Sequence, residues 1–408
     1  RMGKTAVVAE SSQHLGGLTS GGLGATDIGN KAAIGGIARE FYRRLGKHYG
    51  RDEQWTFEPH VAEDQFFQMV NEAQVPVYLQ QRLASVTKAG GRIAEITMES
   101  GKVFRARVFI DATYEGDLMA QAKVSYTVGR EANAQYQETL NGVRAETPKH
   151  QFTVPVDPYA QPGDPSSGLL PFIQPGDGGA PGAGDHRVQT YNYRLCFTTN
   201  AAQRLPLPKP AKYDPAQYEL LARYLEALGA AGQKPRLSQF WNPIWMPNGK
   251  TDINNNGAFS TDFIGLNYDY PEAGYARRAQ IAKAHEEYTR GFIHFLATSP
   301  RVPQDMRDEM QRWGPAKDEF LDTGGWPHQL YVREARRMIS DYVMTEHNCR
   351  GKVTAEDSIG LGAYNMDSHN CQRIAKGGSA HNEGDVQVPV KPYPISYRSI
   401  VPKQNECE

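Results

Sequence analysis

The sequence lacks the features that would assign it to several large classes of protein. Its four cysteines stand far apart, at positions 196, 349, 371 and 407, and form no C-x-x-C pair, which excludes a dense disulfide framework. No apolar run approaches the roughly 20 residues that a membrane-spanning helix needs. Lys and Arg number 45 against 46 Asp and Glu, so neither sign of charge dominates. This balance gives no electrostatic reason to expect a nucleic-acid or membrane partner.

What the chain does have is length and apolar content. Its 408 residues are 39% hydrophobic, enough to bury a sizeable core and to form two or three domains, or one large domain with insertions. It contains 40 Gly and 26 Pro, with aromatic side chains between them. This composition favours many ordered turns and long loops over low-complexity sequence.

The first residues predict a buried parallel strand. Residues 4–9 form a short, mostly apolar run that ends at Glu10. In dinucleotide-binding folds, an acidic residue in this position hydrogen-bonds the ribose hydroxyls, about 20 residues after a G-x-G-x-x-G loop. Taken alone, Glu10 is more simply explained as an ordinary carboxylate at a strand end.

A glycine-rich segment follows, over residues 11–24. Gly16, Gly17, Gly21 and Gly22 would let the backbone approach a ligand closely and present its N–H groups. A flexible linker is the alternative, but three leucines interleaved with the glycines argue against it and predict anchoring to the core. We expect a side chain added at Gly17 or Gly21 to protrude into the ligand's space, and Gly21 to need a positive φ.

Together these stretches resemble the bacterial FAD-dependent oxidoreductases, within the glutathione-reductase-like superfamily. The resemblance covers nearly the whole chain and continues through residues 35–42, 109–118, 128–131, 252–257, 331–337 and 397–402. The most specific of these stretches run from Asp111 to Leu118 and from Tyr331 to Arg337, because a glycine-rich loop alone would be a weak signal.

The resemblance implies an α/β fold with a Rossmann-like FAD-binding domain, an inserted α+β substrate domain and a helical region. We place the FAD-binding domain at residues 1–123 and the substrate domain at 124–270. The helical region and the return toward the FAD domain then occupy residues 271–408. The family pattern opens with a strand and glycine loop that would precede residue 1, and it continues past residue 402. We therefore expect an incomplete FAD-binding domain, a chain truncated at both ends, and weak FAD retention.

FAD is the cofactor that the resemblance implies. Glu10 is expected to bind the adenosine ribose, and the glycine-rich segment is expected to follow the pyrophosphate and ribityl chain. Leu83 lies in a strand that would face the adenine, while Ala112 and Thr113 would lie beside the pyrophosphate. The expected partner is a small-molecule substrate, with homo-oligomerisation left open.

Hydrophobic periodicity predicts the remaining elements. Helices are expected at residues 32–45, 59–73, 215–228, 275–297, 303–313 and 329–344, and strands at 75–79, 83–87, 92–99, 102–110 and 189–197. Pro59 opens the second of these helices, because proline suits the first helical position.

The chemistry of a flavoenzyme needs few side chains, because the flavin accepts the hydride and the protein orients the substrate. A hydroxyl or amine donor also needs a base, most often His. His369, in a polar stretch bracketed by glycines, is our candidate catalytic base, and a hydrogen-bonded loop histidine is the alternative. The other histidines considered are His186, His285, His294, His347 and His381.

Arg333 is the second catalytic candidate. On the helix predicted at 329–344 it would share a face with Arg337, and paired guanidinium groups can clamp a carboxylate or phosphate. A helix carrying interdomain salt bridges is the alternative.

Two tripeptides, His347–Cys349 and His369–Cys371, repeat the sequence H-N-C and suggest a different class of function. A metal-dependent hydrolase or lyase is therefore an alternative, although the spacing does not match common zinc sites and no metal site is assigned. An inactive fragment of a flavoprotein is a third alternative. The leading prediction is an FAD-dependent oxidoreductase that transfers a hydride from a small polar substrate to flavin.

Overall fold

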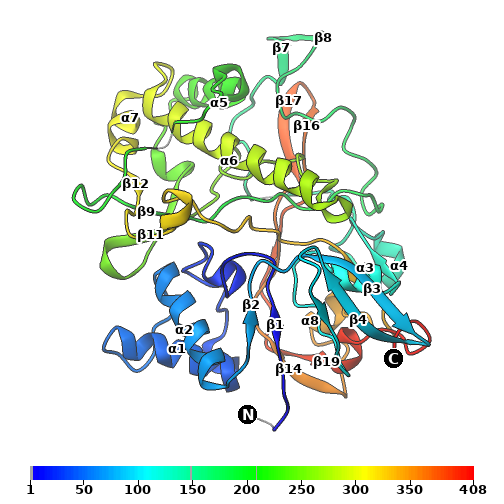
Figure 1. Ribbon diagram of the computed structural model, residues 1–408. Coiled ribbons are helices and arrows are strands. Elements are labelled where there is room, and N and C mark those ends of the chain that lie inside the picture. The colour runs from blue at the N-terminus through cyan, green and yellow to red at the C-terminus, as the bar shows by residue number, and fades with distance from the viewer. Residues whose placement is uncertain (1–2, 148, 208) are drawn as a thin grey trace.

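The computed structural model describes residues 3–147, 149–207 and 209–408. Within these ranges the chain forms a mixed α/β fold of eight α-helices and several small sheets. Helices α1 (Gly36–His48) and α2 (Pro59–Glu72) lie together at the lower left of Figure 1, and the long helix α6 (Tyr275–Thr298) crosses the upper half. None of the helices in the described ranges is both long and apolar enough to cross a membrane.

The N-terminal region contains two small sheets. Strand β1 (Val8–Ala9) pairs in parallel with β2 (Val77–Tyr78), and β3 (Leu83–Ala89), β4 (Arg92–Met98) and β5 (Val103–Phe104) form an antiparallel sheet. In the described residues, β1–β2 is the one pair of named strands that runs in parallel.

The strand predicted at 102–110 is wrong beyond Phe104. Val108 and Ile110 are 73% and 83% exposed, and no described strand pairs with them. An apolar run predicts a strand, but forming one also requires a neighbouring strand to pair with.

The largest sheet of the described residues has four strands. Its order is β10 (Asn242–Trp245), β11 (Lys250–Asn254), β9 (Leu195–Thr198) and β12 (Gly314–Pro315). All four residues of β9 are buried, as expected for a strand with a neighbour on each side. Strand β9 confirms only the end of the strand predicted at 189–197.

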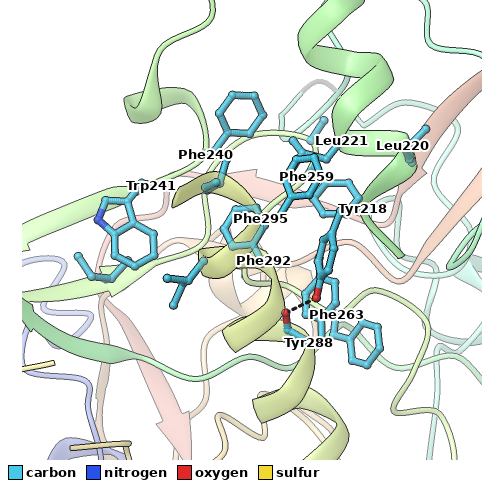
Figure 2. Packing of buried hydrophobic residues seen from close by; sticks show 14 of the residues in the cluster. Tyr218, Leu220, Leu221, Phe240, Trp241, Phe259, Phe263, Tyr288, Phe292 and Phe295 are labelled. Carbon is cyan, nitrogen blue, oxygen red and sulfur yellow. Dashed lines mark hydrogen bonds between the residues drawn. The ribbon is translucent and has the colours of Figure 1, made fainter. Parts of the chain in front are cut away.

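The largest hydrophobic core lies around α6 and the central sheet. Figure 2 shows aromatic side chains converging there from several segments, among them Tyr218, Trp241, Phe259 and Phe292. The hydroxyl of Tyr218 donates a 2.8 Å hydrogen bond to the backbone carbonyl of Tyr288, so this buried phenol is satisfied. A second, smaller cluster joins α1 and α2 through Phe41, Leu45, Phe57, Val61 and Ala62.

Most of the predicted helices are confirmed. Helix α2 begins at Pro59, α6 begins at the predicted residue, and α5 (Glu219–Ala230) follows a 3₁₀ turn at Pro215–Tyr218. Helix α7 (Gln304–Met310) lies within its predicted range. Helix α1 begins four residues later than predicted, because a separate 3₁₀ turn occupies Lys31–Ala33.

The helix predicted at 329–344 is wrong. This stretch is extended, and within it β13 (Arg337–Met338) pairs antiparallel with β6 (Tyr126–Thr127). Tyr331 also pairs with Asn192 as a strand residue would, because its backbone N–H donates a hydrogen bond to the carbonyl of Asn192 at 2.9 Å. Long-range pairing therefore overrides the local helical spacing, and Arg333 and Arg337 do not share a helical face.

The other elements are short. They are α3 (Asp117–Gln121), α4 (Asn133–Tyr136), α8 (Glu346–Cys349), β7 (Tyr159–Gln161), β8 (Asp164–Leu169), β14 (Ser358–Gly362), β15 (Met366–Ser368), β16 (Gln372–Lys376), β17 (Ser379–Glu383), β18 (Val386–Val388) and β19 (Tyr393–Ser396). The pair that matters for the site is β15–β18, because His369 directly follows β15.

Candidate functional site

Glu10 lies at the end of β1, as the sequence predicts. Its backbone N–H donates to the carbonyl of Tyr78 at 2.8 Å, which continues the pairing of β1 with β2. One carboxylate oxygen, Oε1, accepts hydrogen bonds from the Ser12 N–H and the Ser11 hydroxyl. Among the described residues the other oxygen, Oε2, has no hydrogen-bond donor, so it remains available to a ligand.

The glycine-rich segment is anchored to the core, as expected. Leu18 and Leu23 are buried, and Leu15 is half-buried. The backbone N–H of Leu18 donates a 2.7 Å hydrogen bond to the hydroxyl of Tyr114. These contacts fix the course of the segment and distinguish it from a flexible linker.

The glycines of this segment approach protein atoms more closely than any side chain would allow. A Cβ at Gly16 would lie 2.4 Å from the Phe66 ring, and one at Gly22 would lie 2.2 Å from the Arg194 carbonyl oxygen. Both glycines also have a positive φ, of 111° and 130°. Glycine is needed at these two positions for steric reasons that do not involve a ligand.

The prediction that a side chain at Gly17 or Gly21 would protrude into the ligand's space is wrong. A Cβ at Gly17 would meet the Tyr114 hydroxyl at 2.5 Å, and one at Gly21 would meet the Gln329 Cβ at 2.4 Å. Gly17 has a φ of 56°, whereas Gly21 is not among the residues with a positive φ. Substitutions here would therefore collide with protein first, and only the backbone of the segment can face a ligand.

The other cofactor-binding candidates lie close to this segment. The N–H of Gln81, two residues before Leu83, donates to the Glu10 carbonyl at 2.8 Å. The Leu83 carbonyl itself accepts from the Tyr275 hydroxyl at 3.0 Å. Ala112 and Thr113 are exposed and directly precede Tyr114, which bonds the segment. The stretch that contains Leu83 is thus joined to Glu10 through Gln81, and the stretch that contains Thr113 is joined to the glycine-rich segment through Tyr114.

The two catalytic candidates meet at a third residue, Asp262. The ring Nδ1 of His369 lies 2.8 Å from one carboxylate oxygen of Asp262, and the Arg333 guanidinium lies 3.4 Å from the other. Arg333 also donates to the Asn192 side chain at 3.1 Å. Asp262 and Arg333 are each 4% exposed, while the His369 side chain is 15% exposed. The histidine is therefore the accessible member of this buried group.

Burial and charge keep His369 neutral. Burial lowers the pKa of His369, the charge of Arg333 lowers it further, and Asp262 opposes both effects only in part. Burial alone would raise the pKa of Asp262, but Arg333 and His369 outweigh it and lower that pKa. With Asp262 accepting at Nδ1, the neutral ring carries its proton there, and Nε2 presents a lone pair.

Further ionisable groups surround His369. The ring of His150 lies nearly parallel to it, with centroids 6.4 Å apart, and the His150 Nε2 is 3.8 Å from a carboxylate oxygen of Asp385. Burial raises the pKa of Asp385 to about 7, and the charge of Asp367 raises it as well. Perturbed groups of this kind gather at functional sites, which supports this cluster as the candidate active site.

The glycine-rich segment leads toward this cluster. Beyond Gly24, the N–H of Ala25 donates to Asp252, which forms a buried ion pair with Arg194. A Cβ at Gly29 would lie 2.3 Å from the Ala363 carbonyl oxygen, so the chain runs beside the loop that precedes β15. The chain that continues from the glycine-rich segment therefore passes beside the loop that leads to β15 and His369.

Asp262, His150 and Asp385 were not found by sequence reasoning. They occur in loops and in strand-flanking stretches without a motif, and single acids and histidines of this kind are common. Only the fold brings them to His369. Asp252 lay within a stretch that carried the resemblance, but its role in holding Ala25 was not predicted.

The described residues contain one group with the arrangement of metal ligands: Glu58, His60 and Glu319. An ammonium group already occupies it, because Lys250 Nζ lies 2.7 Å from Glu58 and 2.6 Å from Glu319. Burial opposes the charge of Lys250, but the charges of Glu319 and its neighbours raise the pKa of Lys250 above its usual value. The ammonium group of Lys250 thus already forms ion pairs with both carboxylates of this group.

The two H-N-C tripeptides have separate surroundings. His347 contacts the Gln137 carbonyl at 3.0 Å, and His369 contacts Asp262. Neither tripeptide belongs to the candidate metal group of the described residues. The observation that suggested a metal-dependent hydrolase therefore gains no support from their positions.

Comparison with known proteins gives one match. The family model for FAD dependent oxidoreductase matches residues 1–408. No curated protein and no solved structure matches the chain. Because the family match spans every residue, the chain belongs to the FAD dependent oxidoreductase family.

Proposed function

We propose that this protein oxidises a small polar substrate by transferring a hydride to FAD, with His369 as the catalytic base. The observation that carries this proposal is the 2.8 Å contact between His369 Nδ1 and Asp262. A buried carboxylate on one ring nitrogen leaves the other nitrogen free to take a proton, which is the arrangement expected of a general base.

The residues beside the glycine-rich segment fit FAD. Glu10 offers Oε2 to the ribose hydroxyls, as an acid at the end of a second Rossmann strand does. Beside Gly21, both ring nitrogens of His328 are buried and have no partner among the described residues. Buried polar atoms of this kind need a hydrogen-bonding group, and a bound cofactor would supply one. The segment's backbone and Thr113 complete the proposed contacts.

The flavin, when bound, supplies the hydride acceptor. The protein supplies the proton transfer: His369 Nε2 takes the proton from the substrate's hydroxyl or amine. Asp262 keeps the ring in the right tautomer and stabilises the imidazolium that forms. The buried residues around His369 and Asp262 exclude water from the reaction.

In this proposal Arg333 does not clamp a carboxylate or phosphate, the role that the sequence suggested. Its guanidinium is engaged by Asp262, Asn192 and the Thr190 carbonyl, and it lies over the Tyr331 ring at 4.3 Å. These contacts support a positioning residue that holds Asp262 ionised and keeps His369 neutral in the resting state. Arg333 then acts on catalysis through Asp262.

We also propose the division into an FAD-binding region before residue 124, a substrate region to residue 270 and a helical region after it. The separate hydrophobic cluster of α1 and α2 supports the first boundary. The large cluster extends from Val156 to Ala380, so the second and third regions share one core.

The test uses protein loaded with FAD and mixed without oxygen with panels of small alcohols, 2-hydroxy acids and amines. Bleaching of the flavin absorbance reports substrate oxidation. We expect His369→Gln to keep the flavin spectrum and to slow bleaching by about 100-fold or more, the usual size of a base's contribution. His381→Gln, at an exposed histidine of β17, is the matched control and should react like the parent. Equal rates for His369→Gln and the parent would remove His369 from the mechanism.

A further inference from the structure

Two histidines lie face to face beside the glycine-rich segment, away from the His369 dyad. The rings of His14 and His328 are stacked, with centroids 3.7 Å apart and planes only 6° from parallel. His14 belongs to the glycine-rich segment itself, and His328 follows the 3₁₀ turn at Leu321–Thr323. The stack therefore connects the segment to a distant part of the chain.

His14 is held rigidly by two carboxylates. Its Nδ1 lies 3.1 Å from Glu63 of α2, and its Nε2 lies 2.9 Å from Asp322. The ring can donate to both acids only when each nitrogen carries a proton. Glu63 also accepts the N–H of Leu15 at 3.1 Å, so the same carboxylate fixes the neighbouring backbone.

His328 has the opposite environment. Neither of its ring nitrogens has a hydrogen-bond partner among the described residues, and both atoms are buried. Burial and, to a smaller extent, the charge of His14 lower the pKa of His328 to about 4, so the ring is neutral at physiological pH. A neutral imidazole has one donor and one acceptor nitrogen, and leaving both unpaired in a buried site is costly.

The unpaired ring lies next to the glycine-rich segment. A Cβ at Gly21 would be 3.3 Å from His328 Nε2, and the edge of the His328 ring faces Phe320, with centroids 5.5 Å apart. Phe320 offers no hydrogen bond. The polar edge of His328 is thus directed at the same stretch of backbone that we propose follows the cofactor.

We propose that His328 hydrogen-bonds FAD through a ring nitrogen, and that His14 serves as the positioning residue that holds the His328 ring in place. This inference rests on the proposed course of FAD along the glycine-rich segment, but not on the role of His369. It adds two residues to the cofactor site that the sequence did not indicate.

The main test compares FAD affinity with apoprotein stability. His328→Phe keeps a planar ring for the stack and removes both unpaired nitrogens. We expect the apoprotein to melt at or above the parental temperature, because an unsatisfied buried polar group is lost. FAD affinity, measured by titrating apoprotein and following flavin fluorescence, should fall about 3- to 10-fold, as expected for the loss of one hydrogen bond.

A second variant distinguishes the loss of a hydrogen bond to FAD from a folding defect. His328→Gln carries an amide that can reach the position of Nε2, so it should recover part of the FAD affinity lost in His328→Phe. If His328→Phe binds FAD like the parent and its apoprotein is stabilised, the nitrogens do not contact the cofactor and the proposal is overturned. Equal losses of affinity in both variants would also overturn it, because the effect would then come from altered stacking.

A third measurement separates this inference from the placement of FAD on which it rests. Glu10→Ala should weaken FAD binding if the cofactor follows the glycine-rich segment. Weaker binding in Glu10→Ala with parental binding in His328→Phe would overturn the role of His328 alone. Parental binding in both variants would overturn the placement together with the inference.

Discussion

Arg194 and Asp252 form a buried, two-pronged ion pair that fastens the end of the glycine-rich segment. The guanidinium Nε and Nη2 lie 2.8 and 2.7 Å from the two carboxylate oxygens. Asp252 also accepts a hydrogen bond from the backbone N–H of Ala25. The Arg194 carbonyl oxygen lies 2.2 Å from the position that a Cβ of Gly22 would take. One ion pair, between Arg194 directly before β9 and Asp252 of β11, thus fixes the proposed cofactor segment against the central sheet.

Removing the acid from this pair should be strongly destabilising. Asp252→Ala would leave Arg194 buried and without its counter-charge, and breaking such pairs typically costs about 3–5 kcal/mol. We expect the free energy of unfolding, measured by urea denaturation, to fall by that amount. Asp269→Ala removes the acid of an exposed pair with Arg277 and should change it by less than about 1 kcal/mol. Similar effects for the two variants would show that the Asp252 pair is not structurally important.

Glu10→Ala should weaken FAD binding without affecting the fold. A hydrogen bond to a charged group contributes about 1.5–3 kcal/mol, so the dissociation constant should rise by about 10- to 100-fold. Flavin fluorescence during titration of apoprotein measures it. Glu99→Ala, at an exposed acid just after β4, is the control and should bind FAD like the parent. A parental dissociation constant for Glu10→Ala would assign Glu10 to the role of an ordinary strand-end carboxylate.

Gly17→Ala should destabilise the protein because of the backbone and of Tyr114. Gly17 has a φ of 56°, where alanine costs about 1–2 kcal/mol, and its Cβ would lie 2.5 Å from the Tyr114 hydroxyl. We expect a lower melting temperature by calorimetry. Gly229→Ala is the matched control, because Gly229 lies in α5, has no positive φ, and has nothing within 4 Å of an added Cβ. There alanine should stabilise the helix by up to about 1 kcal/mol.

The elements that were predicted correctly are those whose pattern is local. Helix α2 begins at Pro59 and α6 at Tyr275 because start signals and apolar spacing lie within the helix itself. The stretch around Arg333 also has helical spacing, but pairing with β6 and with Asn192 holds it extended. Those partners are more than 130 residues away in the chain, so no local pattern could reveal them.

The candidate site was partly predictable for the same reason. His369 stood out as a polar residue among glycines, and Arg333 stood out within a specific stretch of the resemblance. Their connection depends on Asp262, whose sequence neighbours carry no signal. The glycines were expected to approach a ligand, whereas their Cβ positions are limited by Tyr114 and Gln329. Glycine in a sequence predicts a close approach, but it does not say to what.

Metal removal should leave the protein unchanged. Lys250 already forms ion pairs with Glu58 and Glu319, which are the acids of the candidate metal group in the described residues. We expect dialysis against a chelator to alter neither the melting temperature nor the flavin content, and the zinc content to be well below one per chain. Lys250→Ala is the informative comparison, because it exposes the two acids and should make the melting temperature respond to added zinc. A chelator-sensitive parent protein would contradict this prediction.

Asp385→Asn should make the protein more stable at high pH. Burial and the charge of Asp367 raise the pKa of Asp385 to about 7, well above the roughly 3.9 of an unfolded chain. Between these two values the folded protein binds the proton and the unfolded chain does not. The contribution of Asp385 to stability is therefore fully present below about pH 4, and it is lost as the pH rises through about 7.

An asparagine in this position stays neutral at every pH and avoids that loss. We expect the free energy of unfolding of Asp385→Asn to exceed the parental value by on the order of 2–4 kcal/mol at pH 8.5, and the difference to shrink toward zero at pH 4.5. Urea denaturation at a series of pH values measures both. Asp341→Asn, at an exposed acid, should follow the parental curve throughout. An advantage of Asp385→Asn that does not vary with pH would mean that Asp385 is ionised in the folded protein at both ends of this range, which the hydrogen bond from Gln387 and the charge of Lys149 favour.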